Sequence, residues 1–269
     1  MKGDIYMECG TVILKREGNI AKVIMNSPEN FNAFDFSLGD GLVEAFEVCM
    51  KDNEIRVVVL TGAGKVFNSG GDLKLAKDSI KTDPSEPFRQ LTKRLNRLIS
   101  DIRRLQKPVI AAINGSVGGG GLSIAAACDL RIATASAKFR QAYTSVGLVP
   151  DGAWTLMVPL LIGFGRASEL IFLDPVFDAL KALELGLVNK VVEDSKFEKE
   201  VNEIALKLAD GPTRSFALAK ELLNNALLTL LERQLELERQ GIVASAGSQD
   251  YLEGSEAFFA KRPPVFAGK

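Results

Sequence analysis

The 269-residue sequence contains no histidine. Without an imidazole, the chain can form no Ser-His-Asp or Cys-His nucleophile pair, no His-Glu-x-x-His zinc site and no imidazole proton shuttle. Any acid or base catalysis therefore falls to the side chains of Asp, Glu, Lys, Tyr or Cys.

Cysteine, excess charge and long apolar runs are scarce as well. The three cysteines, Cys9, Cys49 and Cys128, are scattered and form no Cys-x-x-Cys pair, so we expect neither a disulfide framework nor a metal site. The 33 Lys and Arg are balanced by 34 Asp and Glu, which argues against a nucleic-acid partner. No segment approaches the roughly 18 unbroken apolar residues of a membrane span, and Met1–Asp4 shows no secretion-signal pattern. We therefore expect a soluble, cytoplasmic protein with no membrane partner.

Residues 1–195 alternate between strand and helix patterns. Residues 12–24 alternate around Glu17-Gly18-Asn19, which predicts a β-hairpin. The unbroken apolar runs 57–60 and 109–113 are typical of strands buried on both faces. Apolar residues at helical spacing predict helices over 38–49, where Ser37 would cap the first turn, and over 88–105. This order predicts an α/β fold with crossover connections.

From Lys196 onward only helical patterns remain. Gly211-Pro212 interrupts them and Pro263-Pro264 ends them. No change of composition marks a linker, so we predict a core over residues 1–195 that carries the candidate site, and an appended helical region over residues 196–269. The polar stretch from Lys74 to Pro87 has no clear periodicity and predicts a mobile loop.

Two glycine-rich segments follow predicted buried strands. The first is Phe67-Asn-Ser-Gly-Gly-Asp-Leu-Lys74, and the second runs from Asn114 through Gly118-Gly-Gly-Gly121 to Ser123. Glycine lets backbone N–H groups approach a ligand, and two N–H groups converging on one carbonyl oxygen form an oxyanion hole. Neither segment is a Walker A loop or a clear dinucleotide-binding unit. Each one alone also fits a tight turn with close helix packing.

Short motifs run through the chain in a fixed order. They are Asn32-Ala33, Val59-Leu60-Thr61-Gly62, Phe67 to Leu73, Lys107 to Gly115, Ala127-Cys128-Asp129-Leu130, Gly147-Leu148-Val149-Pro150, and Glu253-Gly254 with Phe258 and Lys261-Arg262-Pro263. This ordered set resembles the crotonase, or enoyl-CoA hydratase/isomerase, family over nearly the whole chain. The resemblance implies a spiral of ββα repeats and a helical C-terminal region that builds a homotrimer or a dimer of trimers. It also implies an acyl-CoA thioester as substrate and no separate cofactor, because coenzyme A is part of that substrate.

The resemblance assigns roles within the two glycine segments. The N–H groups of Gly71 and Gly120 match the oxyanion hole, which would hold the thioester oxygen as it becomes an enolate. Ser69 and Leu73, from the same segment as Gly71, are expected to contact the substrate. Asp72 is expected to cap a helix.

Two residues near the C-terminus match positions that lie close to the coenzyme A nucleotide in relatives. These are Phe258 and Lys261. A hydrophobic core position is the other interpretation of Phe258, and a solvated helix-end cation is the other interpretation of Lys261.

The catalytic positions of the family's hydratases are changed in this chain. Those enzymes use two glutamates, and the matching residues here are Ser123 and Tyr143. Neither a serine hydroxyl nor a tyrosine with a pKa of about 10 readily replaces a carboxylate as a base at neutral pH. Tyr143 is instead expected to contact the substrate, and hydration by the standard mechanism is disfavoured.

Asp151 is the one acid at a position that the family uses. Its Pro-Asp-Gly context also fits an ordinary turn. The resemblance matches it to the single catalytic carboxylate of isomerases that shift double bonds in enoyl-CoA thioesters. For that role its pKa would have to rise from about 3.9, which burial beside Trp154, Leu148 and Tyr143 could achieve.

Three alternatives to an isomerase stay open. Aryl-CoA dehalogenases of the family share the aspartate, with Tyr143 in place of an aromatic residue near the reacting ring, but they also use a histidine. A hydratase-type lyase could use another acid, such as Glu86 from the 74–87 segment. A catalytically silent protein could bind acyl-CoA with Asp151 as a turn residue.

Asp129, which precedes a predicted strand, is expected to be structural.

Overall fold

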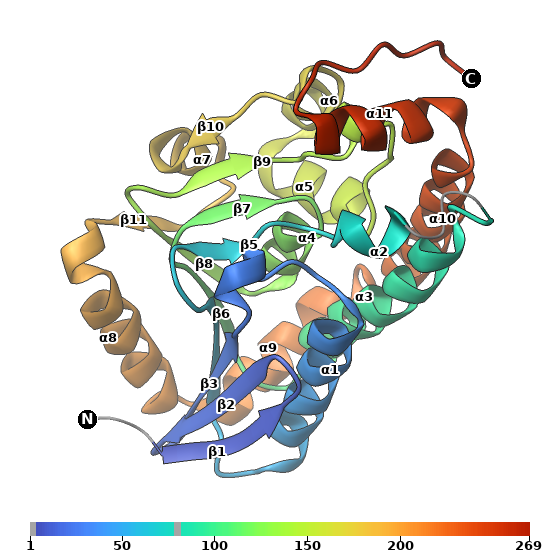
Figure 1. Ribbon diagram of the computed structural model, residues 1–269. Coiled ribbons are helices and arrows are strands. Elements are labelled where there is room, and N and C mark those ends of the chain that lie inside the picture. The colour runs from blue at the N-terminus through green and yellow to red at the C-terminus, as the bar shows by residue number, and fades with distance from the viewer. Residues whose placement is uncertain (1–3, 78–81) are drawn as a thin grey trace.

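The computed structural model describes residues 4–77 and 82–269 (Figure 1). Two short segments lie outside the described residues: residues 78–81, which belong to the predicted 74–87 loop, and residues 1–3. The strands are β1 (Asp4–Cys9), β2 (Val12–Glu17), β3 (Ile20–Met25), β4 (Val57–Gly62), β5 (Val66–Asn68), β6 (Val109–Ile113), β7 (Ser116–Gly118), β8 (Leu130–Thr134), β9 (Lys138–Arg140), β10 (Phe177–Asp178) and β11 (Lys190–Val192).

Helices make up most of the remainder. The α-helices are α1 (Phe36–Lys51), α2 (Leu73–Lys77), α3 (Glu86–Arg104), α4 (Gly120–Ala127), α5 (Trp154–Ile162), α6 (Phe164–Leu173), α7 (Ala179–Leu185), α8 (Phe197–Ala209), α9 (Thr213–Asn225), α10 (Leu228–Ala246) and α11 (Gln249–Ala260). The 3-10 helices of the described residues are η1 (Pro28–Asn30), η2 (Thr144–Val146) and η3 (Asp194–Lys196).

The strands form two sheets. The larger sheet has seven strands in the order β1-β2-β3-β4-β6-β8-β11, antiparallel from β1 to β3 and parallel from β3 onward. The smaller sheet has four strands in the order β10-β9-β7-β5. The chain passes from β4 to β5, from β6 to β7 and from β8 to β9, each time moving from the larger to the smaller sheet before it enters a helical segment. The predicted α/β class and the 12–24 hairpin are confirmed.

The central strands of the larger sheet are buried on both faces, as their unbroken apolar runs predict. Along β4, Val58 and Leu60 belong to the main core, while Val57 and Val59 pack in a second cluster with Val201 and other residues of α8. In Figure 1, α8 lies on one side of the larger sheet, and α1 and α3 lie on the other. Alternate residues of one strand therefore hold helices against opposite faces.

Two local predictions are wrong. The N-cap of α1 is Asp35 and not Ser37: the Asp35 carboxylate accepts a hydrogen bond from Leu38 N at 2.7 Å. Both ends of the predicted 74–87 loop are helical, because α2 extends to Lys77 and α3 begins at Glu86.

Helices α10 and α11 of the C-terminal region are packed into the main core. Leu231, Leu235 and Ile242 of α10 and Tyr251 of α11 belong to the same hydrophobic cluster as β4 and α3. Phe88 of α3 meets the Tyr251 ring edge-on, with centroids 5.3 Å apart. Across residues 4–77 and 82–269, no helix has both the length and the apolar character needed to cross a bilayer.

Candidate active site

The two glycine-rich segments touch each other at Gly70 and Gly119. Both have positive φ, +98° and +49°, and a Cβ on Gly70 would lie 3.2 Å from the Gly119 Cα. A Cβ on Gly121 would lie 2.6 Å from the carbonyl oxygen of Asn68. The Asn68 side chain also holds the first segment, since its Oδ1 accepts from Gly70 N at 2.8 Å. Glycine is required here because two backbones meet at van der Waals distance.

Among the described residues, the hydrogen bonds between these segments use neither of the two predicted oxyanion-hole N–H groups. Gly71 bridges to Phe34, but the hydrogen bonds of that bridge use the Gly70 carbonyl and the Asp72 N–H. Gly120 is the first residue of α4, and the first four N–H groups of a helix have no acceptor within it. Both glycines line one cavity of 550 Å³.

That cavity brings together every predicted site residue. The residues are Ser69, Gly71, Leu73, Gly120, Tyr143, Asp151, Phe258 and Lys261. They come from the first glycine segment, the start of α4, the segment from η2 to α5, and the end of α11. The sequence positions are thus gathered in space, while their roles stay predictions.

Asp151 is the buried acid of this cavity. Its side chain is 7% exposed, and its Oδ1 accepts a hydrogen bond from the Tyr143 hydroxyl at 2.7 Å. Burial raises the pKa of Asp151 from 3.8 to about 6, and the Tyr143 hydrogen bond opposes that rise. A carboxyl group with this pKa is mostly ionised at neutral pH, yet it is a stronger proton acceptor than an exposed aspartate.

Ser123 and Tyr143 lie beside this carboxyl group. The Ser123 hydroxyl donates to the backbone oxygen of Asp151 at 2.7 Å and lies 3.4 Å from the Tyr143 oxygen. Burial and the nearby Asp151 charge raise the pKa of Tyr143 well above 10. Both side chains are therefore neutral hydrogen-bonding groups around Asp151.

The cavity has an apolar interior and a polar opening. Its interior is lined by Phe88, Leu91, Leu95, Val146, Leu148 and Ile242, all well shielded from solvent. Exposed residues at the opening include Lys74, Phe258 and Lys261. Phe258 is 57% exposed, so the core interpretation of that residue is wrong. Lys261 caps the end of α11 with φ of +53° and also lines the cavity.

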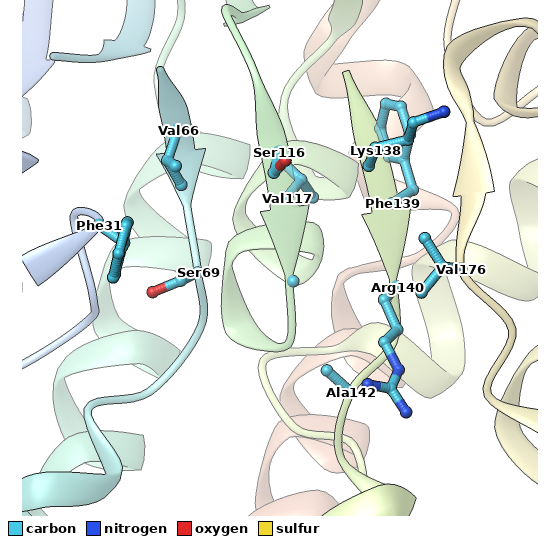
Figure 2. Close-up of a pocket in the computed structure, with 11 residues that line it drawn as sticks. Phe31, Val66, Ser69, Ser116, Val117, Lys138, Phe139, Arg140, Ala142 and Val176 are labelled. Atoms are coloured by element: carbon cyan, nitrogen blue, oxygen red, sulfur yellow. The ribbon is translucent and has the colours of Figure 1, made fainter. Parts of the chain in front are cut away.

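A second, smaller hollow of 320 Å³ lies over β5, β7 and β9 (Figure 2). It shares Phe31, Ser69, Arg140 and Ala142 with the larger cavity. Arg140 is paired with Asp174 at 3.0 Å. Among the described residues that line this hollow there is no Asp or Glu, so it lacks a carboxylate for proton transfer.

The remaining predicted acids have other partners. Glu86 is exposed at the start of α3, where it pairs with Arg89 at 3.0 Å, and it is absent from the described cavity lining. Asp72 lines the cavity and accepts from Lys74 N at 2.9 Å, as a helix cap does; it also accepts from Asn30 Nδ2 at 2.8 Å. Asp129 forms an ion pair with Lys220 at 2.7 Å and is structural, as predicted. In the described chain, no group of three or more His, Cys, Asp or Glu is arranged to hold a metal ion.

A buried acid next to the Asp151 turn was missed from the sequence. Glu238 of α10 is 5% exposed, and its carboxylate accepts from Ala153 N at 2.6 Å and Thr155 N at 2.8 Å. The available signal was a glutamate on the apolar stripe formed by Leu231, Leu235 and Ile242.

Known proteins are similar to this chain in sequence and in fold. The profile of the enoyl-CoA hydratase/isomerase family matches residues 15–269. The chain belongs to this family. The 1,2-epoxyphenylacetyl-CoA isomerase of Escherichia coli (strain K12) is 36% identical over 257 residues, which cover 94% of this chain and 97% of that protein. The short-chain-enoyl-CoA hydratase of Clostridium acetobutylicum is 34% identical over 257 residues, covering 95% and 97%.

The solved structures agree. The crystal structure of an enoyl-CoA hydratase from Mycobacterium avium subsp. paratuberculosis K-10 has a TM-score of 0.88 at 32% identity, covering 97% of this chain and 100% of that one. The expected crotonase fold is therefore confirmed. Members of the enoyl-CoA hydratase/isomerase family act on acyl-CoA thioesters, and the two relatives above are named for different reactions.

Proposed function

We propose that this family member is an enoyl-CoA isomerase in which Asp151 moves a proton along the acyl chain. The observation that supports this most strongly is the buried Asp151 carboxyl group in the same cavity as Gly71 and Gly120, with a pKa raised to about 6. An isomerase of this type needs one group that both accepts and donates a proton. A carboxyl group with a pKa near the working pH can do both.

The reaction begins with a 3-enoyl-CoA. The Asp151 carboxylate takes a proton from the carbon next to the thioester carbonyl, and the electron pair moves toward the carbonyl oxygen to give a dienolate. The N–H groups of Gly71 and Gly120 hold that oxygen, and removing one such donor typically slows a reaction by about 10²- to 10³-fold. Asp151 then returns the proton two carbons along, which leaves a conjugated 2-enoyl-CoA. Because Tyr143 donates to Oδ1, we assign the transferred proton to Oδ2.

Hydration is the second candidate, and the side chains around Asp151 argue against it. A hydratase of this family activates water with carboxylates, whereas the two matching positions are Ser123, bound to a backbone oxygen, and Tyr143, whose pKa is raised well above 10. Glu86 pairs with Arg89 outside the cavity. The aryl-CoA dehalogenases of the family also use a histidine, which this sequence lacks, so dehalogenation is disfavoured.

One ultraviolet assay tests the proposal. Wild-type protein is mixed with a 3-enoyl-CoA and, separately, with a 2-enoyl-CoA, and the absorbance of the conjugated thioester is followed. An isomerase raises the absorbance of the first mixture, whereas a hydratase lowers that of the second. No change in either mixture, together with measurable coenzyme A affinity, would favour a silent acyl-CoA binder.

A further inference from the structure

Helix α5 begins directly after the Asp151 turn, and its first residues lack a cap of their own. The N-cap position is Ala153, which has φ of +64° and no side-chain acceptor. The N–H groups in the first turn of a helix need acceptors from elsewhere. Without one, the chain between Asp151 and α5 would be free to adopt other conformations.

Glu238 supplies these acceptors from α10, far along the chain. Its Oε2 accepts from Ala153 N at 2.6 Å, and its Oε1 accepts from Thr155 N at 2.8 Å. The Thr155 hydroxyl also donates to Oε1, and Gln234 donates to that hydroxyl at 2.7 Å. A negative charge at the start of a helix is further favoured by the helix dipole.

Burial of the Glu238 carboxylate costs free energy that its hydrogen bonds must offset. Glu238 is 5% exposed, and in the described part of the chain its carboxylate accepts from N–H and O–H donors and pairs with no cation. Burying a carboxylate is expensive, although hydrogen bonds offset much of the cost. Burial raises the pKa of Glu238 to about 7, and the charge of Asp151 acts in the same direction. The two carboxyl groups are therefore close enough to interact electrostatically.

The turn that carries Asp151 is held from three directions. Ser123 of α4 donates to the Asp151 backbone oxygen at 2.7 Å, and Tyr143 donates to the side chain at 2.7 Å. Glu238 holds the following residues through Ala153 and Thr155. The first two contacts act on Asp151 directly, and the third fixes the chain only two residues away.

We propose that Glu238 is a positioning residue for Asp151, which anchors the catalytic turn to α10 through the first turn of α5. The inference rests on the proposed role of Asp151 as the proton-transferring group. It assigns to the C-terminal helical region a part in catalysis that does not require contact with the substrate. Glu238 does not line the cavity in the described chain, so its loss alters the placement of the carboxyl group and leaves the substrate contacts in place.

The test uses a reaction that requires only proton abstraction. A saturated acyl-CoA in D₂O exchanges its α-protons when Asp151 removes a proton from the carbon next to the carbonyl and returns a deuteron from solvent. Isomerisation of a 3-enoyl-CoA is measured in parallel. The variants are Glu238→Ala, Glu238→Gln and Thr155→Val, and Thr155→Ser retains the hydroxyl. The matched control is Glu236→Ala, which removes an exposed glutamate of the same helix that pairs with Arg239.

Misplacing a catalytic group lowers kcat more than it weakens substrate binding. We expect Glu238→Ala to lower kcat for exchange by about 10- to 100-fold with KM within about threefold of wild type, since displacements of about 1 Å can cost about 10²-fold. Thr155→Val should show a smaller loss of the same kind, Thr155→Ser should restore it, and Glu236→Ala should match wild type. A helix cap with only a structural role would lower the melting temperature and leave kcat unchanged.

The outcomes separate this inference from the proposed function. Wild-type kcat in both Glu238→Ala and Glu238→Gln would overturn the positioning role. Glu238→Gln decides alone if Glu238→Ala does not fold, because an amide has one acceptor oxygen for the two N–H groups of Ala153 and Thr155. A wild-type protein that exchanges α-protons but does not isomerise would overturn the isomerase proposal and leave the role of Glu238 standing when its variants lose exchange. A wild-type protein that neither exchanges α-protons nor isomerises a 3-enoyl-CoA would overturn both proposals, and in one that isomerises without exchange the same kcat comparison is made on isomerisation.

Discussion

Replacing Tyr143 by Phe would isolate the hydrogen bond that tunes Asp151. The Tyr143 hydroxyl donates to Asp151 Oδ1 at 2.7 Å in a buried site. Burial raises the pKa of Asp151, this hydrogen bond lowers it, and the resulting pKa is about 6. A hydrogen bond to a charged group contributes about 1.5–3 kcal/mol. Since 1.36 kcal/mol corresponds to one pKa unit, its loss should raise the pKa of Asp151 by about 1–2, to about 7–8.

The pH dependence of isomerisation measures this change. In wild type, about nine-tenths of Asp151 is ionised at pH 7, whereas in Tyr143→Phe the ionised fraction should fall to between about one-tenth and one-half. The acidic limb of kcat/KM should move to higher pH by about 1–2 units, and activity should recover on the alkaline side.

Tyr6→Phe is the matched control for this experiment. Tyr6 is 49% exposed and donates to the carboxylate of Asp52 at 3.3 Å, so the same atom is removed from a solvated pair. The control should leave the pH profile unchanged. An unmoved acidic limb in Tyr143→Phe, or one displaced to lower pH, would refute the reasoning.

Three further predictions concern stability and assembly. Because burial raises the pKa of Asp151 from 3.8 to about 6, its ionisation destabilises the fold as the pH rises through that range, by up to about 3 kcal/mol. The free energy of unfolding of Asp151→Asn should therefore exceed that of wild type only slightly at pH 4 and by an amount approaching that limit at pH 8. Urea denaturation that shows no such increase would contradict this prediction. Gly121→Ala would place a Cβ 2.6 Å from the Asn68 carbonyl oxygen and should cost about 1–3 kcal/mol in the same assay, whereas an unchanged midpoint would show that the two segments separate easily. Phe164 and Phe172 are each 80% exposed, and we expect other subunits to cover them. Light scattering should then give three or six times 29.1 kDa, and a monomer mass would refute the expected trimer.

Much of the fold is visible in the sequence because its largest elements carry clear periodicity. The both-face burial of β4 follows from the run at residues 57–60, and α3 follows from the stripe between Phe88 and Leu105. The smaller sheet does not follow, because β5, β7 and β9 have three residues each and so short a run shows no period. Its strands are held by pairing between segments far apart in the sequence, β5 with β7 and β7 with β9.

The candidate site, too, could be predicted from the sequence only in part. Asp151 and the glycines at 71 and 120 could be found because each lies within a short local motif. Glu238 could not be linked to Asp151, because its partners Ala153 and Thr155 are more than 80 residues away in sequence. The error at Ser37 has a local cause, since Asp35 lies two residues earlier and is also a good cap.

The most direct test of the proposed chemistry is the rate at which Asp151→Asn isomerises a 3-enoyl-CoA. Asparagine keeps the shape of the side chain and cannot exchange a proton at neutral pH. We expect wild type to produce conjugated thioester, Asp151→Asn to be slower by at least about 10²-fold, and the control Asp40→Asn, at an exposed aspartate paired with Arg94, to match wild type. Isomerisation by Asp151→Asn at the wild-type rate would contradict the assignment of Asp151 as the acid and base.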